Sequence, residues 1–160
     1  MTTTIKYASL KSLHTCIALI LGQILFAQEV TYNHDELDLH NDGEADDEKI
    51  TIPEFVEVYE IDGPFFFGVA TKFEEMARTR TSAAVRIIRM RKVSFIDATG
   101  LHNLEIFVDA SVDNGRKIIL SGVNENVYRS LERSGLVEKI GKENILDNIH
   151  AALDRSFDVV

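Results

Sequence analysis

The chain has 160 residues, a formal net charge of −9, and a composition that is 45% hydrophobic and 27% charged. These values are typical of one globular domain with room for an additional segment. Proteins that bind nucleic acid need a basic surface to neutralise phosphates, and 17 Lys and Arg residues against 26 Asp and Glu residues do not readily provide one. The composition therefore argues against nucleic acid as a partner.

The chemistry-bearing residue types also exclude several kinds of site. A single cysteine, Cys16, rules out an internal disulfide and a cysteine-built zinc site, and the histidines lack the paired spacing of metal ligands. No glycine-rich phosphate loop follows a predicted strand, and no Ser or Cys is convincingly set beside a His and a carboxylate. We therefore expect no metal, no cofactor and no catalytic activity.

Residues 1–33 form an apolar N-terminal segment. From Cys16 to Ala27 the sequence is hydrophobic around the whole circumference of a helix, yet it is shorter than the roughly 20 residues that cross a bilayer. It fits the core of a signal peptide, a buried helix, or the inner part of a truncated membrane helix. Leu25 stands where signal-peptide cleavage after Ala27 would need a small residue, so we favour the remnant of a last membrane helix.

Residues 34–50 are expected to be a solvated acidic linker, because their many Asp and Glu side chains repel one another and bury nothing. A calcium loop beginning at Asp38 would need a carboxylate at its twelfth position, where Lys49 stands, and His40 occupies its third position. We therefore do not expect calcium binding.

The domain proper is expected to span residues 51–157, where strand and helix signals alternate. A strand is predicted at residues 56–61, and an Asp-Gly-Pro turn leads to a second buried strand at residues 65–68. The apolar spacing that follows, at i, i+4, i+7 and i+8, predicts a helix from Val69 to near Arg80.

Further strands are predicted at residues 85–90 and 117–120. In the first of them Arg86 and Arg89 lie on opposite faces of an extended chain, and we interpret both as mostly solvated. Strands that alternate with helices need crossover connections, so these strands are expected to pair in parallel. Helices are predicted from Leu101 to the Asn114-Gly115 stop, from Asn124 to Gly135, and around Ile145, Ile149, Ala152 and Leu153.

The strongest candidate site is the run from Ser94 to Leu101, where a buried strand ends and an amphipathic helix begins. Backbone N–H groups of a first helical turn lack partners within the helix, and this end is partly positive, so it stabilises negative charge. An alternative remains open, in which Asp97 or Thr99 is only the helix cap and contributes about 1 kcal/mol. The partner- or anion-facing turn comprises Ser94, Asp97, Ala98, Thr99, Gly100 and Leu101.

The sequence Phe-Ile-Asp-Ala-Thr-Gly-Leu at residues 95–101 resembles a motif of the STAS domain, the module shared by anti-sigma-factor antagonists and the cytoplasmic tails of SulP-type sulfate and anion transporters. Residues 56–68, 118–123 and 131–136 resemble further parts of the same family, so the resemblance covers residues 52–155. It implies an α/β fold like that of anti-sigma antagonists, with a mixed sheet, a leading hairpin, later parallel strands and helices packed mainly on one face.

The transporter branch is favoured by the Gly-Pro-Phe-Phe-Phe run at residues 63–67, which resembles its opening hairpin, and by the apolar segment and acidic linker before the domain. Gln28 and Glu29 depart from the basic residues usual in that branch. The resemblance implies a non-catalytic regulatory and protein-interaction domain, present as a fragment or a stand-alone module at the cytoplasmic face of the inner membrane. The implied partners are the membrane portion of a SulP-type transporter, other cytosolic regulatory proteins, or a second copy.

Two other functions stay open from the resemblance. In antagonists that are switched by kinases, the motif carries a phosphorylatable hydroxyl at the position matched by Thr99, while Ala98 occupies the preceding hydroxyl position. Thr99 is therefore the candidate phospho-acceptor of a free-standing anti-sigma factor antagonist, where a phosphate would place roughly 1.5 to 2 negative charges beside Asp97. Nucleotide or anion sensing by the domain is the further alternative.

Overall fold

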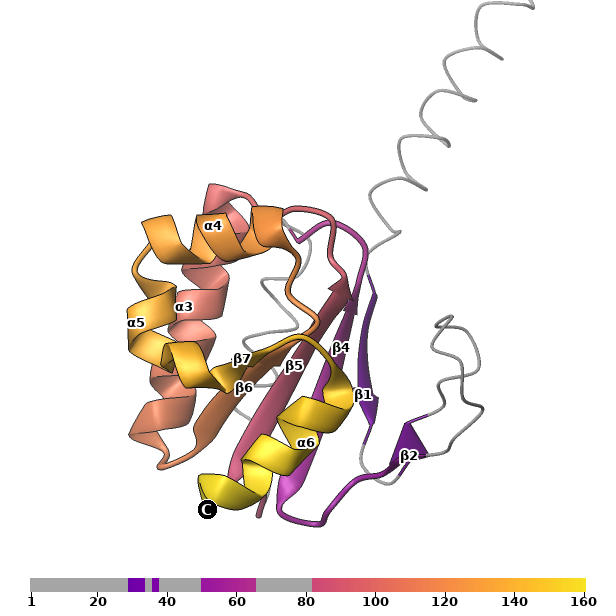
Figure 1. Ribbon diagram of the computed structural model, residues 1–160. Helices are drawn as coiled ribbons and strands as arrows, with labels where there is room; N and C mark the ends of the chain where they lie inside the picture. Colours follow the sequence, from indigo (N-terminus) through magenta and orange to yellow (C-terminus); the bar gives the residue numbers. More distant parts are fainter. Residues whose placement is uncertain (1–28, 34–35, 38–49, 66–81) are drawn as a thin grey trace, which may run out of the picture.

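The computed structural model describes residues 29–33, 36–37, 50–65 and 82–160 (Figure 1). Residues 66–68 of the strand expected at residues 65–68, the helix expected from Val69, and most of the apolar segment and the acidic linker lie outside these described residues. The described residues form a central sheet with helices packed against it.

A five-stranded mixed sheet has the order β1-β4-β5-β6-β7. Strands β4 to β7 are parallel to their neighbours in this series, and β1 is antiparallel to β4. The strands are β1 Glu29–Asn33, β4 Val56–Asp62, β5 Val85–Lys92, β6 Lys117–Ser121 and β7 Ile145–Leu146. A separate antiparallel pair joins β2 Glu36–Leu37 to β3 Ile50–Thr51.

Asparagine and aspartate caps define where the long helices begin. Asp97, Asn124 and Asn148 each accept a hydrogen bond from the backbone N–H three residues further on, at 2.7, 3.0 and 2.9 Å. Such caps satisfy one of the N–H groups that a helix start leaves without an internal partner. The helices are α3 Ala98–Asp113, α4 Glu125–Arg133, α5 Leu136–Ile140, the 3-10 helix η2 Lys142–Asn144 and α6 Ile149–Asp158.

Both faces of the sheet are buried, because alternate residues of each strand point to opposite sides. On one face Ile88 and Leu120 belong to a core that includes α3, α4 and α5. On the other face Ile87 and Ile119 pack with Leu153 of α6. In Figure 1 α6 lies in front of the strands, apart from α3, α4 and α5. The expectation that helices pack mainly on one face is confirmed for the described helices.

The strands predicted at residues 56–61, 85–90 and 117–120 are confirmed as β4, β5 and β6, and they pair in parallel as expected. The helices predicted after the candidate turn and after Asn124 are confirmed as α3 and α4. Ile145 lies in β7 rather than in the last helix, which begins at Ile149. A strand of two residues is too short to show a period of its own, so the helical spacing was extended wrongly across it.

The antiparallel strand of the sheet comes from an unexpected part of the chain. It is β1, at residues 29–33, which lies before the expected start of the domain at residue 51 and pairs with β4 along its whole length. Phe65, expected to open the second strand of a hairpin, instead makes an isolated parallel bridge with Ile96. Because β1 and β5 occupy both edges of β4, Phe65 has no place beside β4 and meets the segment that follows β5.

Candidate functional site

The candidate turn connects the end of β5 at Lys92 to the start of α3 at Ala98, at the carboxyl edge of the parallel strands. Val93 and Ile96 are buried and extend the core beyond the strand. Ser94 and Phe95 are exposed, and Phe95 keeps 50% of its surface open to solvent. The turn therefore presents an aromatic ring and a hydroxyl outward while apolar neighbours hold it to the core.

Backbone hydrogen bonds from a neighbouring segment fix this turn. The N–H of Phe65 donates to the carbonyl of Phe95 at 2.9 Å, and the N–H of Asp97 donates back to the carbonyl of Phe65 at 3.2 Å. The side-chain amide of Asn124, which also caps α4, donates to the carbonyl of Val93 at 2.6 Å. Two separate segments of the chain thus hold the backbone of the turn in one conformation.

Asp97 is the N-cap of α3, which resolves the alternative between Asp97 and Thr99 as cap residue. Its backbone is extended, with φ −92° and ψ 178°, and its Oδ1 accepts a hydrogen bond of 2.7 Å from the N–H of Gly100. The carboxylate is therefore already engaged with the first turn of the helix, where it also complements the helix dipole. The structural role of Asp97 is established by this contact.

Gly100 is buried where α3 passes closest to the neighbouring segment. A Cβ at this position would lie 2.4 Å from the carbonyl oxygen of Phe65 and 2.9 Å from Cγ1 of Ile96. Only glycine leaves room for this approach, because the nearest atom belongs to a backbone that is itself held by hydrogen bonds. Gly100 therefore faces the core, whereas its neighbour Thr99 is exposed to solvent.

The outward side of α3 combines a hydroxyl, an imidazole and an aliphatic side chain. Thr99, His102 and Ile106 are all exposed, with Ile106 at 46%, and their spacing of three and four residues places them on one side of the helix. We call these three residues the α3 surface. Of the other candidate residues, Ala98 is exposed and Leu101 is half-buried.

The sequence analysis did not single out Phe95 or Ile106 as surface residues. Exposure of an apolar residue at one position of an amphipathic helix carries no sequence signal of its own, because Ile106 neighbours the buried Phe107 and Val108. Phe95 is similarly next to the buried Ile96. Ser94 and Phe95 are two consecutive exposed residues between the buried Val93 and Ile96, so no alternating pattern indicates the exposure of Phe95.

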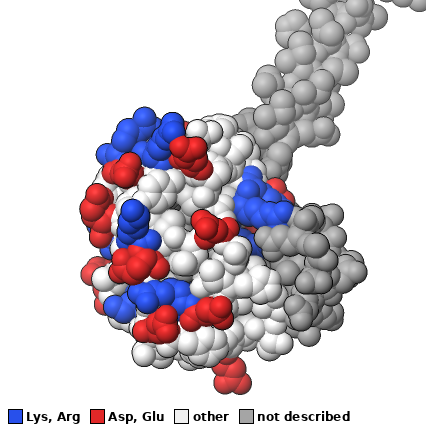
Figure 2. Space-filling model, viewed as in Figure 1, with Lys and Arg blue, Asp and Glu red and all other residues white. Residues whose placement is uncertain are grey.

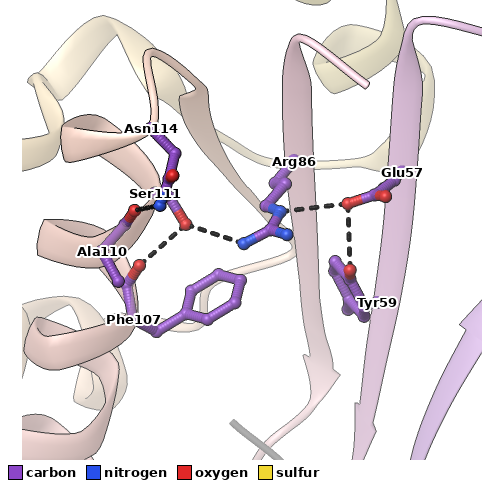
Figure 3. Close-up of polar contacts among 7 residues, drawn as sticks. All are labelled: Glu57, Tyr59, Arg86, Phe107, Ala110, Ser111 and Asn114. Carbon is purple, nitrogen blue, oxygen red and sulfur yellow. Dashed lines mark hydrogen bonds and ion pairs between the residues drawn. The ribbon is translucent and has the colours of Figure 1, made fainter. Parts of the chain in front are cut away.

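The interpretation of Arg86 and Arg89 as solvated residues is wrong. Their exposed fractions are 0% and 1%, and each faces a carboxylate of the neighbouring strand β4. Nε of Arg86 lies 3.0 Å from Oε2 of Glu57 (Figure 3), and Nη1 of Arg89 lies 3.5 Å from Oε2 of Glu60. Helices cover both faces of the sheet, so the two arginines are buried on opposite sides as ion pairs.

A spacing shared by two strands is the signal that would have found these pairs. Acids stand three residues apart at positions 57 and 60 of β4, and arginines stand three residues apart at positions 86 and 89 of β5. The parallel register places Glu57 opposite Arg86 and Glu60 opposite Arg89. Matched spacing of opposite charges in two predicted strands therefore indicates one ion pair on each face of the sheet.

A lysine joins α5 to the exposed side of α3. Nζ of Lys139 donates to Oε1 of Glu105 at 2.8 Å and to Oδ2 of Asp109 at 3.0 Å. These hydrogen bonds, first that of Glu105, raise the pKa of Lys139 above 10.5. Beside this contact is a groove of about 440 Å³ lined by residues of both helices and of β6, among them Val112, Lys117 and Glu138.

Charges of both signs are interspersed on the face shown in Figure 2, where the described residues present no broad area of one sign. Within residues 50–65 and 82–160, no three His, Cys, Asp or Glu side chains are grouped so that they could hold a metal ion. The helices of the described ranges are all too short or too polar to span a membrane. The chemistry of the described site is thus that of a rigid turn and a helix side with polar and apolar groups.

Comparison of the sequence with known proteins gives two matches. The sequence model of the STAS domain matches residues 49–152. YvdB of Bacillus subtilis (strain 168), which is named as a sulfate transporter, is 26% identical over 95 residues. That match covers 58% of this chain and 18% of YvdB, so the chain spans less than a fifth of the length of this relative.

Solved structures share the fold. A sulfate transporter family protein from Wolinella succinogenes is 40% identical, with a TM-score of 0.66 over 69% of this chain and 91% of that one. The STAS domain of a SulP transporter from Vibrio cholerae is 30% identical, with a TM-score of 0.61 over 76% and 91%. A Thermotoga maritima protein described as an anti-sigma factor antagonist shares the fold at 18% identity, with a TM-score of 0.57 over 67% and 92%.

Proposed function

The chain belongs to the STAS domain family, and from this premise we propose that it is a non-catalytic regulatory and protein-interaction module of a SulP-type transporter of sulfate or another anion. Support comes from the solved structures at 40% and 30% identity, which are named as a sulfate transporter family protein and as a SulP STAS domain. In this proposal the module works at the cytoplasmic face of the inner membrane, and its partner is the membrane portion of the transporter.

The observation that carries the proposal is the combination of a fixed backbone with an outward-facing side. The turn before α3 is held by Phe65 and Asn124, while Thr99, His102 and Ile106 are exposed beside it. A rigid backbone reduces the conformational entropy that is lost on binding, and mixed polar and apolar groups are typical of protein contacts. We assign the docking role to the α3 surface.

The division of the chain into an apolar segment at residues 1–33, an acidic linker at residues 34–50 and a STAS domain at residues 51–157 is part of the same proposal. The match of the family to residues 49–152 supports the position of the domain. The sheet also includes β1, so residues 29–33 contribute to the domain in addition to their place at the end of the apolar segment.

A binding experiment with a charged substitution tests the docking role. The membrane portion of a SulP transporter from the same genome is reconstituted in nanodiscs, and binding of the full chain is measured with wild type, Ile106→Arg and Val160→Arg. Val160 is 72% exposed at the end of the chain and serves as the matched control. We expect Ile106→Arg to weaken binding at least tenfold and Val160→Arg to leave it unchanged, because a charge in the centre of a contact is desolvated there.

Two outcomes contradict the proposal at different points. Equal binding of wild type and Ile106→Arg would remove the α3 surface as the docking site. Absence of binding by the wild-type chain to the membrane portion would remove the transporter as its partner.

A free-standing anti-sigma factor antagonist switched by phosphorylation is the second candidate function, and the position of Thr99 favours it. Thr99 is exposed in the first turn of α3, where the helix dipole stabilises added negative charge. In this alternative a phosphate on Thr99 would disfavour a partner that contacts Asp97. Mass spectrometry of the protein from its native host, together with Thr99→Val, tests it: unmodified Thr99 under all growth conditions and unchanged behaviour of the variant would end this alternative.

A further inference from the structure

A buried arginine connects the sheet to the last turns of α3 (Figure 3). Nε of Arg86 in β5 donates to Oε2 of Glu57 in β4 at 3.0 Å, and its Nη1 donates to the hydroxyl of Ser111 in α3 at 3.1 Å. The Ser111 hydroxyl in turn donates to the carbonyl of Phe107 at 2.8 Å. The Ser111 hydroxyl therefore accepts a hydrogen bond from Arg86 of the sheet and donates its own proton within α3.

Aromatic rings enclose the same cation. The guanidinium carbon of Arg86 lies 5.1 Å from the ring centre of Phe107 and 5.9 Å from that of Tyr59, within the range of cation–π attraction. The hydroxyl of Tyr59 donates to the carboxylate oxygen that also receives Arg86, at 2.9 Å. Figure 3 shows Arg86 reaching from the sheet between Glu57 on one side and Ser111 on the other. All five side chains are buried.

Stability alone does not account for a charge at this position. Removing a carboxylate and a guanidinium from water is costly, and apolar residues of similar volume replace such pairs in other proteins without loss of stability. Apolar contacts are non-directional, whereas hydrogen bonds depend on distance and angle. The property that this network adds to the core is therefore a fixed position of the groups that it joins.

Two contacts place α3 against the sheet and the segment beside it, while Glu105 and Asp109 between them bind Lys139 of α5. Near its start Gly100 lies against the carbonyl of Phe65, and near its end Ser111 receives Arg86. These points are 11 residues apart, or about 16 Å along a helix that rises 1.5 Å per residue. Between them Leu104 packs in the apolar core, and the ring of Phe107 faces Arg86 and Tyr59 of the sheet.

We propose that Arg86 is a positioning residue, which holds the C-terminal half of α3 in one register on the sheet through Ser111. The outward position of Ile106 follows from this register, because Ile106 lies in the same helix between the two points. This last step rests on the function proposed for the α3 surface, whereas the positioning role itself does not depend on a partner.

Amide hydrogen exchange on the full chain without a partner tests the positioning role. Ser111→Ala removes the acceptor that α3 offers to Nη1 of Arg86. Ser156→Ala is the matched control, because Ser156 is an equally buried helix serine whose hydroxyl donates to the carbonyl of Leu153 in α6 at 2.6 Å. We expect the amides of residues 107–113 to lose protection about tenfold in Ser111→Ala and to keep it in Ser156→Ala. Amides of β6 are expected to change less than those of α3.

A second variant separates positioning from stability. Glu57→Met, Tyr59→Phe and Arg86→Met together remove the charged groups and the phenol while keeping the volume of the core. We expect its unfolding midpoint to stay near that of wild type while the amides of residues 107–113 still lose protection. Unchanged α3 protection in either variant, equal loss in Ser156→Ala, or an equal loss in α3 and β6 would each overturn the positioning role.

Measuring binding to the membrane portion of the transporter tests only the link between Arg86 and the α3 surface. If the membrane portion of the transporter binds wild type, weaker binding of Ser111→Ala supports a link from Arg86 to the α3 surface, and unchanged binding overturns that link. If wild type does not bind, the proposed function fails, and hydrogen exchange still decides whether Arg86 positions the helix.

Discussion

Helix α3 passes so close to Phe65 that a single methyl group at residue 100 should disturb the domain. The Cβ of Gly100→Ala would lie 2.4 Å from the carbonyl oxygen of Phe65, about 1 Å inside normal contact. This oxygen cannot rotate away, because it accepts the N–H of Asp97, and the N–H of Phe65 is bound to Phe95. The helix start must therefore shift outward to admit the methyl group.

Two opposing contributions set the expected magnitude. Alanine is favoured over glycine inside a helix by about 1 kcal/mol. Overpacking against fixed neighbours costs about 1–3 kcal/mol, and displacement of the helix start also weakens the cap from Asp97, which contributes about 1 kcal/mol. We predict a net loss of about 2 kcal/mol in the free energy of unfolding, which lowers Tm by roughly 4–8 °C for a chain of this size.

Urea unfolding followed by circular dichroism measures this loss, with Ala110→Gly as the control. Ala110 is half-buried in the same helix, and its replacement by glycine should cost about 1 kcal/mol through helix propensity alone. Glycine should thus be the better residue at position 100 and the poorer one at position 110. A Gly100→Ala protein as stable as wild type would refute the close approach of α3 to Phe65.

Three further substitutions test individual contacts. Asp97→Ala should lower the free energy of unfolding by about 1 kcal/mol in thermal melts while Asp97→Asn retains most of it, and equal losses would contradict a capping role. Arg86→Met should cost about 3–5 kcal/mol in urea unfolding, because Glu57 stays buried without its cation, and a loss below about 1 kcal/mol would contradict that burial. The hydrogen bonds that raise the pKa of Lys139 stabilise the protein fully below pH 10.5, and this stabilisation is lost as the pH rises through the raised pKa. Above pH 10.5 wild type should therefore lose more stability than Lys139→Met. Parallel pH profiles of these two proteins would contradict the ion pairs of Lys139.

Local signals were sufficient for the central strands and for the capped helices α3 and α4. The apolar period of β5 and the cap at Asn124 are complete within a few residues, so no distant contact is needed to recognise them. The turn at residues 94–101 was located for the same reason. The choice of Asp97 over Thr99 as the cap could not be made, because it depends on where Phe65 holds the backbone of the turn.

Burial of charge depends on neighbours that a single strand does not reveal. Arg86 alternates correctly with apolar residues, and only the register with Glu57 and the helix above it distinguish a buried cation from a solvated one. The same limit applies to β1, because residues 29–33 adjoin an apolar run and their partner strand begins more than twenty residues later. By composition, residues 29–33 resemble the apolar run that precedes them, whereas in the structure they pair with β4.

Because the buried charges of β4 and β5 are paired, these two strands should be exchanged together between related domains. A chimaera that imports β4 from a relative lacking acids at positions 57 and 60, while keeping the native β5, would leave one buried guanidinium group on each face of the sheet without its carboxylate from β4. Grafting and recombination within this family should therefore tolerate breakpoints before β4 or after β5 better than breakpoints between them.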